Sequence, residues 1–231
     1  MKSTGRPRIA GIVFVALLLW GALAAGSAWA KDTLLYIVRH TEKQTVLEDN
    51  GGCLMEACVE FASGKSCCAE ELSDLGLLRR DALTGWFARR RITASLTHVF
   101  SSHKPRTMQT VEGIAADAGL TVEPLAPAEC LVPDTECEEA CASGKVSIPA
   151  TLAAIRDLPP GSTALIGQHS GTIYLILEEL GIDTSDPYTF PRDDDGKVAG
   201  YDNLWKIRIR PTGEAELARY QRLEFVLRRG W

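Results

Sequence analysis

Short runs of hydrophobic residues are separated by longer stretches of mixed polarity through the middle of the chain. Most of these runs are apolar or β-branched without regular polar interruption, which is typical of strands buried on both faces. Near the C-terminus, Trp205, Ile207 and Ile209 alternate with basic residues, which indicates a half-exposed strand, and 216–225 is expected to return beside it. The buried strands are predicted at 33–38, 96–100, 121–125 and 164–167.

Between the runs, apolar residues recur at the spacing of three and four that places them on one face of a helix. Ser73 is a candidate N-cap for the first helix, and Gly119 is expected to end the second. Strands that alternate with helices predict an α/β fold, a three-layer α/β/α sandwich with a mainly parallel sheet. The helices are predicted at about 74–90, 106–118, 148–158 and 172–180.

The first 30 residues have the pattern of a signal peptide. A basic start precedes the apolar run 9–25, and Ala28-Trp29-Ala30 matches the A-x-A signal of a cleavage site. We therefore expect a signal peptide at 1–30, one domain at 31–231, and a periplasmic or secreted protein without stable membrane insertion after cleavage. An uncleaved anchor is the alternative, because the run is long for a signal and slightly short for a span.

The composition is that of a globular protein, with 231 residues, 45% hydrophobic and 24% charged. Lys and Arg number 25 against 30 Asp and Glu, which argues against a nucleic-acid partner. Removal of 1–30 takes away three basic residues and no acidic ones, so the formal net charge changes from -5 to -8.

Seven cysteines fall in two clusters, and an oxidising compartment would convert them to disulfides. We expect two cysteine-bearing loop insertions, at about 44–71 and 126–145. The odd count leaves one thiol free or paired to another chain, and the spacing leaves the connectivity open. A zinc site is a weaker alternative, since the clusters have no C-x-x-C pair and no nearby histidine. The clusters are Cys53, Cys58, Cys67 and Cys68, then Cys130, Cys137 and Cys141.

Basic or imidazole groups follow three of the predicted strands: the pair Arg39-His40, then Arg106, then His169. Each is common on protein surfaces when taken alone. A parallel sheet brings the carboxyl ends of its strands to one crevice, so we expect these groups to converge. Guanidinium groups match phosphate oxygens in pairs, and helix N-termini add backbone N–H donors. The joint occurrence therefore predicts a site for a phosphate dianion.

Four motifs together resemble the histidine phosphatase (phosphoglycerate mutase-like) superfamily. They occur in the family's order over about 33–181, and the match weakens in the two cysteine-bearing loops. The motifs are Y-I-V-R-H-T-E-K at 36–43, L-S-D-L-G-L-L-R-R at 72–80, F-S-S-H-K-P-R-T-M-Q-T at 100–110, and I-G-Q-H-S-G-T-I at 166–173.

The resemblance implies that His40 is a nucleophile that carries the phosphoryl group as phosphohistidine. A neutral imidazole has the lone pair that this requires, and no metal or other cofactor is expected. Arg39, Arg106 and His169 would complete the phosphate pocket. Further contacts to substrate or pocket rim are expected from Thr41, which should narrow the approach, from Glu42, from Ser102, which either donates to phosphate or shapes its turn, and from Ser170.

The chain departs from the family where many members have a carboxylic acid that protonates the leaving group. Glu129 is our candidate for this acid, and a solvated loop residue is the competing interpretation. Members that act on phosphohistidine lack an obvious acid, so its absence would change the substrate class. His169 is followed by Ser170 instead of aspartate, which argues against the acid phosphatase and phytase branch.

The sequence therefore predicts an exported, metal-independent phosphatase that hydrolyses a phosphomonoester through His40. The expected substrate is a phosphorylated small molecule or glycan. One alternative is a non-catalytic phosphate-binding or interaction module of the same fold. A phosphoglycerate mutase is a further alternative. Export argues against it, because an exported enzyme would meet little phosphoglycerate.

Overall fold

Six strands form one mixed sheet in the order β5-β4-β6-β1-β7-β8. The computed structural model describes residues 31–43, 71–131 and 140–223, and the backbone of 58–60 and 66–68. The first four strands in this order run parallel, β7 is antiparallel to β1, and β8 is antiparallel to β7. The strands are β1 (Thr33–Arg39), β4 (His98–Ser102), β5 (Val122–Leu125), β6 (Thr163–Gln168), β7 (Asn203–Ile209) and β8 (Ala215–Arg222).

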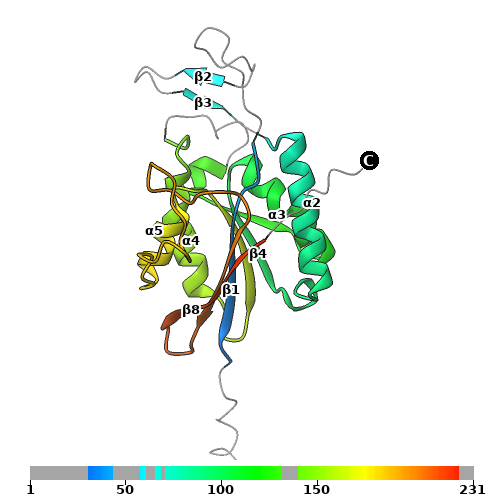
Figure 1. Ribbon diagram of the computed structural model, residues 1–231, viewed down its shortest axis with the longest axis vertical. Helices are drawn as coiled ribbons and strands as arrows, with labels where there is room; N and C mark the ends of the chain where they lie inside the picture. The colour runs from blue at the N-terminus through cyan, green and yellow to red at the C-terminus, as the bar shows by residue number, and fades with distance from the viewer. Residues whose placement is uncertain (1–30, 44–57, 61–65, 69–70, 132–139, 224–231) are drawn as a thin grey trace, which may run out of the picture. The chain divides into compact units, whose positions relative to one another are not determined.

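Helices cover both faces of this sheet (Figure 1). In β1, Leu35 and Ile37 pack into one hydrophobic cluster, whereas Tyr36 and Val38 pack into a second cluster. The strand is therefore buried on both faces, as its unbroken apolar run predicts. A mainly parallel sheet between two layers of helices confirms the predicted α/β/α sandwich. The helices are α2 (Asp74–Arg89) and α3 (Pro105–Asp117) on one face, α4 (Ser147–Asp157) and α5 (Ile173–Glu179) on the other.

Most element boundaries agree with the sequence prediction. The Ser73 hydroxyl accepts a hydrogen bond from the backbone N–H of Gly76 at 3.1 Å and caps α2. Gly119 follows α3 with φ of 69°, a conformation in which glycine is unstrained. The second strand begins at His98 instead of Leu96, because a 3₁₀ turn at Thr93–Ser95 precedes it. Other 3₁₀ turns are η2 (Ala128–Leu131) and η3 (Gly144–Val146).

The two cysteine-bearing segments differ in how much of them is described. In the first, β2 (Cys58–Glu60) and β3 (Ser66–Cys68) pair as an antiparallel hairpin, which the aperiodic sequence did not predict. In the second, Cys130 and Cys141 form a disulfide, as expected for a stapled loop. Cys53 and Cys137 lie outside the described residues, so the rest of the pairing stays open.

Asp32–Trp231 form one compact unit. The predicted signal peptide at 1–30 lies outside the described residues, and its boundary with the domain stays a prediction. Among the helices of the described part, none is long and apolar enough to cross a membrane.

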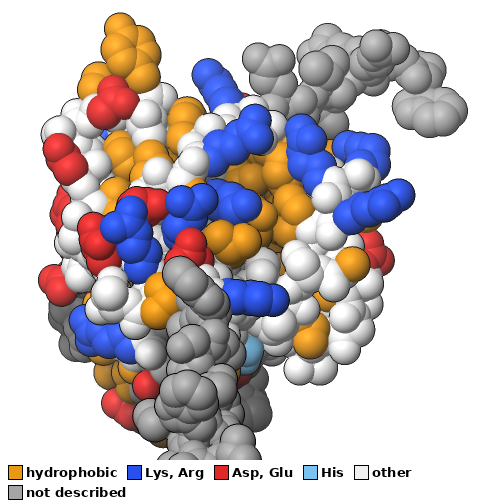
Figure 2. Space-filling model, turned by 90° about the horizontal axis from the view of Figure 1, so that it is seen from below, with side chains coloured by type: hydrophobic (Ala, Val, Ile, Leu, Met, Phe, Trp, Pro, Cys, Tyr) orange, Lys and Arg blue, Asp and Glu red, His pale blue; other side chains and the backbone are white. Residues whose placement is uncertain are grey.

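The β7-β8 hairpin turns at the end of the sheet where β1 begins, opposite the carboxyl ends of the parallel strands. Figure 2 views the molecule from this end and shows Lys and Arg side chains with Asp and Glu beside several of them. Arg208 pairs with Glu216 at 2.9 Å, and Arg210 pairs with Glu214 at 2.9 Å. Exposed pairs of this kind contribute little stability, so the hairpin depends mainly on its backbone ladder and on buried side chains such as Ile207.

Candidate active site

The sheet itself places two histidines side by side. Arg39 and Gln168 are register partners on the neighbouring parallel strands β1 and β6, and His40 and His169 come directly after them. The backbone N–H of His40 continues the ladder by donating to the carbonyl of Gln168 at 2.9 Å. The ring centroids of the two histidines lie 5.4 Å apart. Both side chains are buried, so the two imidazoles form the centre of the site.

The hydrogen bonds of His40 fix its tautomer. Its Nδ1 lies 2.7 Å from the carbonyl oxygen of Thr41, which only accepts, so Nδ1 carries the proton. Burial and the positive charge of Arg106 lower the pKa of His40 to about 3. The ring is therefore neutral at physiological pH, and Nε2 has a lone pair available for attack.

Arg39 is held by a loop that precedes β7. Its Nη1 donates to the carbonyl oxygens of Val198 at 2.8 Å and Gly200 at 2.9 Å. The Tyr201 ring lies 4.1 Å from the guanidinium carbon and 6.1 Å, centroid to centroid, from the His40 ring. Tyr201 is thus an aromatic wall of the site that the sequence analysis missed. The only signal in the sequence was its place just before the predicted half-exposed strand, in Tyr201-Asp202-Asn203-Leu204-Trp205.

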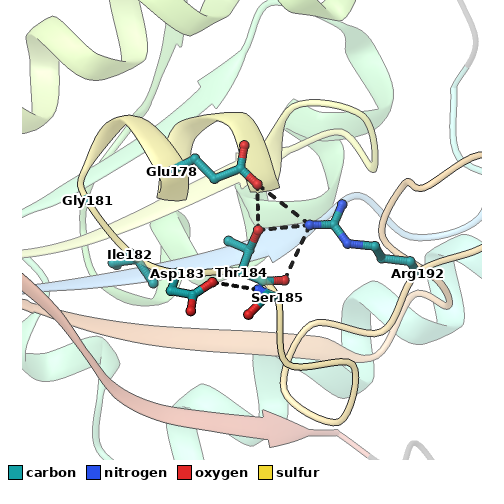
Figure 3. A pocket seen from close by; sticks show the side chains of 7 residues that line it. All are labelled: Glu178, Gly181, Ile182, Asp183, Thr184, Ser185 and Arg192. Atoms are coloured by element: carbon teal, nitrogen blue, oxygen red, sulfur yellow. Dashed lines mark hydrogen bonds and ion pairs between the residues drawn. The ribbon is translucent and has the colours of Figure 1, made fainter.

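Arg192 anchors the same loop to α5, as Figure 3 shows. Its guanidinium donates to the Thr184 hydroxyl at 2.8 Å and lies 3.6 Å from a carboxylate oxygen of Glu178. The guanidinium also stacks 4.2 Å from the centre of the Tyr174 ring. The hollow of about 440 Å³ between these residues is lined by groups that pair with one another. We therefore interpret this hollow as the anchor of the loop that holds Arg39.

Ser170 contributes to the site through its backbone. Its carbonyl accepts from the N–H of Val198 at 3.0 Å, which ties the segment after His169 to the loop that carries the acceptors of Arg39. The predicted contact between the Ser170 side chain and substrate stays a prediction.

The first turn of α3 lies against the second histidine. The Ser102 hydroxyl lies 2.7 Å from Nε2 of His169 and 2.8 Å from the Thr107 hydroxyl. Arg106, half-buried in the same turn, is close enough that its charge lowers the pKa of both histidines. For His169, burial is the larger cause and lowers the pKa well below its usual value. Both imidazoles are thus neutral beside fixed guanidinium charges.

Thr41 and Glu42 connect the nucleophile loop to the helices. The Thr41 hydroxyl donates to the carbonyl of Gly76 in α2 at 2.9 Å, and its N–H donates to the Thr110 hydroxyl of α3 at 3.1 Å. Glu42 forms an ion pair with Arg79 at 2.6 Å. These contacts give both residues a role in fixing the loop, and their contacts with substrate stay predictions.

The disulfide-bearing segment packs directly on His169. A Cβ added to Gly144 would lie 2.3 Å from Cδ2 of the His169 ring, so only glycine fits there without displacement. Nearby, Nε2 of His103 donates to the carbonyl of Cys141 at 3.0 Å. Neither contact was predicted, because the segment has no periodic pattern.

Glu129 is exposed in η2 and forms no hydrogen bond or ion pair with another described residue. No contact among the described residues joins Glu129 to the histidines, and its role as the acid stays a prediction. Four other acidic residues in the segment before α4, Asp134, Glu136, Glu138 and Glu139, lie outside the described residues. Within the described part, no group of His, Cys, Asp and Glu side chains is arranged to hold a metal ion.

Comparison with solved structures identifies the fold. The structure of the protein histidine phosphatase SixA complexed with tungstate is similar with a TM-score of 0.50 and 14% identity, covering 82% of this chain and 96% of that one. The chain has the histidine phosphatase fold. A phosphoserine phosphatase variant from Entamoeba histolytica in complex with phosphoserine is also similar, with a TM-score of 0.48 and 15% identity, covering 84% of this chain and 100% of that one. Neither protein-family models nor curated proteins match the sequence.

The histidine phosphatase fold agrees with the resemblance that the four motifs indicate. The groups predicted to bind phosphate follow the carboxyl ends of its parallel strands. The structure brings together His40, Arg39, Ser102 and His169 through contacts, and Arg106 through its electrostatic effect on both histidines.

Proposed function

We propose that the protein is a phosphatase that hydrolyses a phosphomonoester through a phosphohistidine on His40, without a metal ion. The observation that carries this proposal is the pair of buried, neutral imidazoles beside Arg39 and Arg106. A site for binding phosphate alone needs cations and N–H donors. A nucleophilic nitrogen kept unprotonated at physiological pH suits covalent catalysis instead.

In the first step, the Nε2 lone pair of His40 attacks phosphorus while the bond to the leaving oxygen breaks. The leaving oxygen takes a proton from solvent water, and the phosphoryl group stays on Nε2 of His40. In the second step, water attacks phosphorus, the N–P bond breaks, and phosphate leaves with His40 neutral again. Arg39 and Arg106 oppose the negative charge on the phosphoryl oxygens in both transition states.

The test is release of phosphate from 4-nitrophenyl phosphate in the presence of a chelator. We expect wild-type protein to turn over, and His40→Ala to lose at least about a thousandfold in kcat. His98→Ala is the matched control, since that ring stacks on Phe100 at 5.7 Å at the start of β4, away from the carboxyl ends of the strands.

An aryl phosphate has a good leaving group that hardly needs an acid, so a missing acid would not hide the activity. If wild-type protein binds phosphate but releases none from this ester, the proposal is wrong and the chain is a phosphate-binding module. Activity that disappears with chelator and returns with a divalent cation contradicts the metal-free mechanism.

We further infer that the enzyme is exported and acts on a phosphorylated small molecule or glycan of the cell envelope. The pattern of residues 1–30 supports export. The Cys130–Cys141 disulfide supports it independently, because disulfides persist in oxidising compartments. Fractionation of cells that make the full chain tests this inference, and protein recovered with residues 1–30 intact in the cytosol would contradict it.

A further inference from the structure

A chain of hydrogen bonds runs from His169 to the first turn of α3. We propose that Ser102 and Thr107 are positioning residues that hold His169 in its Nε2–H tautomer, so that Nδ1 is the nitrogen that meets the phosphoryl group. This inference rests on the proposed function, because it assumes that a phosphoryl group occupies the space beside His40.

The series of hydrogen bonds from His169 to Thr107 is short and shielded from water. Nε2 of His169 lies 2.7 Å from the Ser102 hydroxyl, and that hydroxyl lies 2.8 Å from the Thr107 hydroxyl. The Thr107 hydroxyl in turn donates to the carbonyls of Lys104 at 2.7 Å and of Ser102 at 3.0 Å. Ser102 and Thr107 are fully buried, and His169 is 7% exposed. The three groups therefore satisfy one another, and water does not compete for their hydrogen bonds.

The direction of each bond follows from the count of hydrogens. Thr107 has one hydroxyl hydrogen, and carbonyl oxygens only accept, so this hydrogen goes to the backbone of Lys104 or Ser102. The contact between the two hydroxyls must then use the hydrogen of Ser102. With that hydrogen committed, the contact between Ser102 and His169 must use a hydrogen on Nε2. The weak contact from the N–H of Lys104 to the Ser102 oxygen, at 3.4 Å, agrees with Ser102 as acceptor.

The two histidines consequently hold opposite tautomers. His40 carries its hydrogen on Nδ1, facing the Thr41 carbonyl, and has its lone pair on Nε2. His169 carries its hydrogen on Nε2 and has its lone pair on Nδ1. A neutral His169 can therefore contact a phosphoryl oxygen only when that oxygen carries a proton, or when Nδ1 gains one. Binding of a phosphate dianion should then be accompanied by uptake of one proton, which stays between the ligand and Nδ1.

The first experiment reads the tautomer directly in the full protein labelled with ¹⁵N-histidine. Long-range proton–nitrogen NMR at neutral pH distinguishes Nε2–H from Nδ1–H, and the His169 signal is identified by its loss in His169→Gln. We expect Nε2–H for His169 in wild-type protein. Observation of the Nδ1–H form there would overturn the inference, whether or not the protein is an active phosphatase.

Two variants of Thr107 test its part in this series of hydrogen bonds. In Thr107→Val the Ser102 hydroxyl loses its acceptor, so it should turn and donate to Nε2, and His169 should change to the Nδ1–H form. Thr107→Ser keeps a hydroxyl and should keep the wild-type tautomer. Ser101→Ala is the matched control, because this neighbouring serine is also fully buried but donates to the Ser102 carbonyl at 2.9 Å. A wild-type tautomer in folded Thr107→Val would overturn the role of Thr107.

The second experiment measures the affinity for inorganic phosphate as pH rises from neutrality. Proton uptake makes the affinity of wild-type protein fall more steeply, by up to about tenfold per pH unit, than that of a variant whose His169 donates from Nδ1. Ser102→Ala and Thr107→Val should lose this extra slope, whereas Thr107→Ser and Ser101→Ala should retain it. A purely structural role of Ser102 would weaken binding equally at every pH, and that result would overturn the inference.

Failure of this inference is distinguishable from failure of the proposed function. If the protein hydrolyses 4-nitrophenyl phosphate but His169 shows the Nδ1–H form, the proposed function stands and the inference about Ser102 and Thr107 is wrong. If His169 shows the Nε2–H form and the affinity for phosphate is linked to proton uptake, but the protein has no turnover, the inference about binding stands. The proposed catalytic function is then wrong.

Discussion

At the scale of single residues, the site depends on side chains that are held in place by hydrogen bonds and ring contacts to the protein. The Arg39 guanidinium donates to two carbonyls and has one face covered by Tyr201. His40 is bonded to its neighbour's carbonyl. Such fixed groups do not need to reorganise when a charged ligand arrives, which is the main source of electrostatic stabilisation in active sites.

Tyr201→Leu should raise KM by about three- to tenfold, because a cation–π contact with Arg39 contributes on the order of 1 kcal/mol. Tyr201→Phe keeps the ring and should stay near wild type. Steady-state kinetics with 4-nitrophenyl phosphate measure both. Tyr188→Leu is the control, since that side chain is 89% exposed, and an equal effect there would contradict a specific role for Tyr201.

At the scale of elements, the segment between β5 and α4 acts as a support for the second histidine. The Cys130–Cys141 disulfide closes it, and both sulfur-bearing side chains are buried with Ala126. Gly144 lies against the His169 ring a few residues later. Loosening this segment should therefore affect both stability and catalysis.

The double variant Cys130→Ser, Cys141→Ser should lower the free energy of unfolding by about 2–4 kcal/mol, chiefly because the unfolded chain gains freedom. We also expect kcat to fall more than KM rises, since His169 loses its packing partner. Thermal unfolding and steady-state kinetics test the two effects. A lower Tm with unchanged kcat would mean that the segment stabilises the fold without positioning His169.

The elements themselves were largely predictable from sequence, whereas their side-chain contacts were not. Burial on both faces gives β1 and β6 unbroken apolar runs, and the start of helix α2 is predicted by its N-cap, Ser73. The histidines and arginines were found because parallel strands bring their carboxyl ends together. Tyr201 and Thr107 were missed, since nothing in local periodicity reveals which hydroxyl or ring a loop brings to a distant histidine.

At the scale of the whole molecule, two buried neutral imidazoles couple stability to pH. The pKa of His40 in the folded protein is about 3, and that of His169 is also far below its usual value, whereas both titrate near 6.5 once unfolded. The unfolded chain thus binds more protons between these values. The contribution of the two neutral imidazoles to the free energy of unfolding is fully present above about pH 6.5 and decreases as pH falls toward the folded pKa values.

We expect the free energy of unfolding to fall by on the order of 1 kcal/mol per pH unit for each imidazole over this window. Urea unfolding at a series of pH values measures the slope. The double variant His40→Asn, His169→Asn should show a shallower slope than wild-type protein. An unchanged slope in the double variant would mean that other groups dominate acid unfolding.

The distance between the histidines follows from the ladder between β1 and β6, where Arg39 pairs with Gln168, and adjacent strands are about 4.8 Å apart in any sheet. The spacing of their backbones is therefore set by the two strands, whereas the surrounding segments hold the rings in their orientation. In evolutionary terms, the centre and the rim of this site can vary separately. Loops that follow the strands can change in length and sequence while the backbone positions of the histidine pair stay the same.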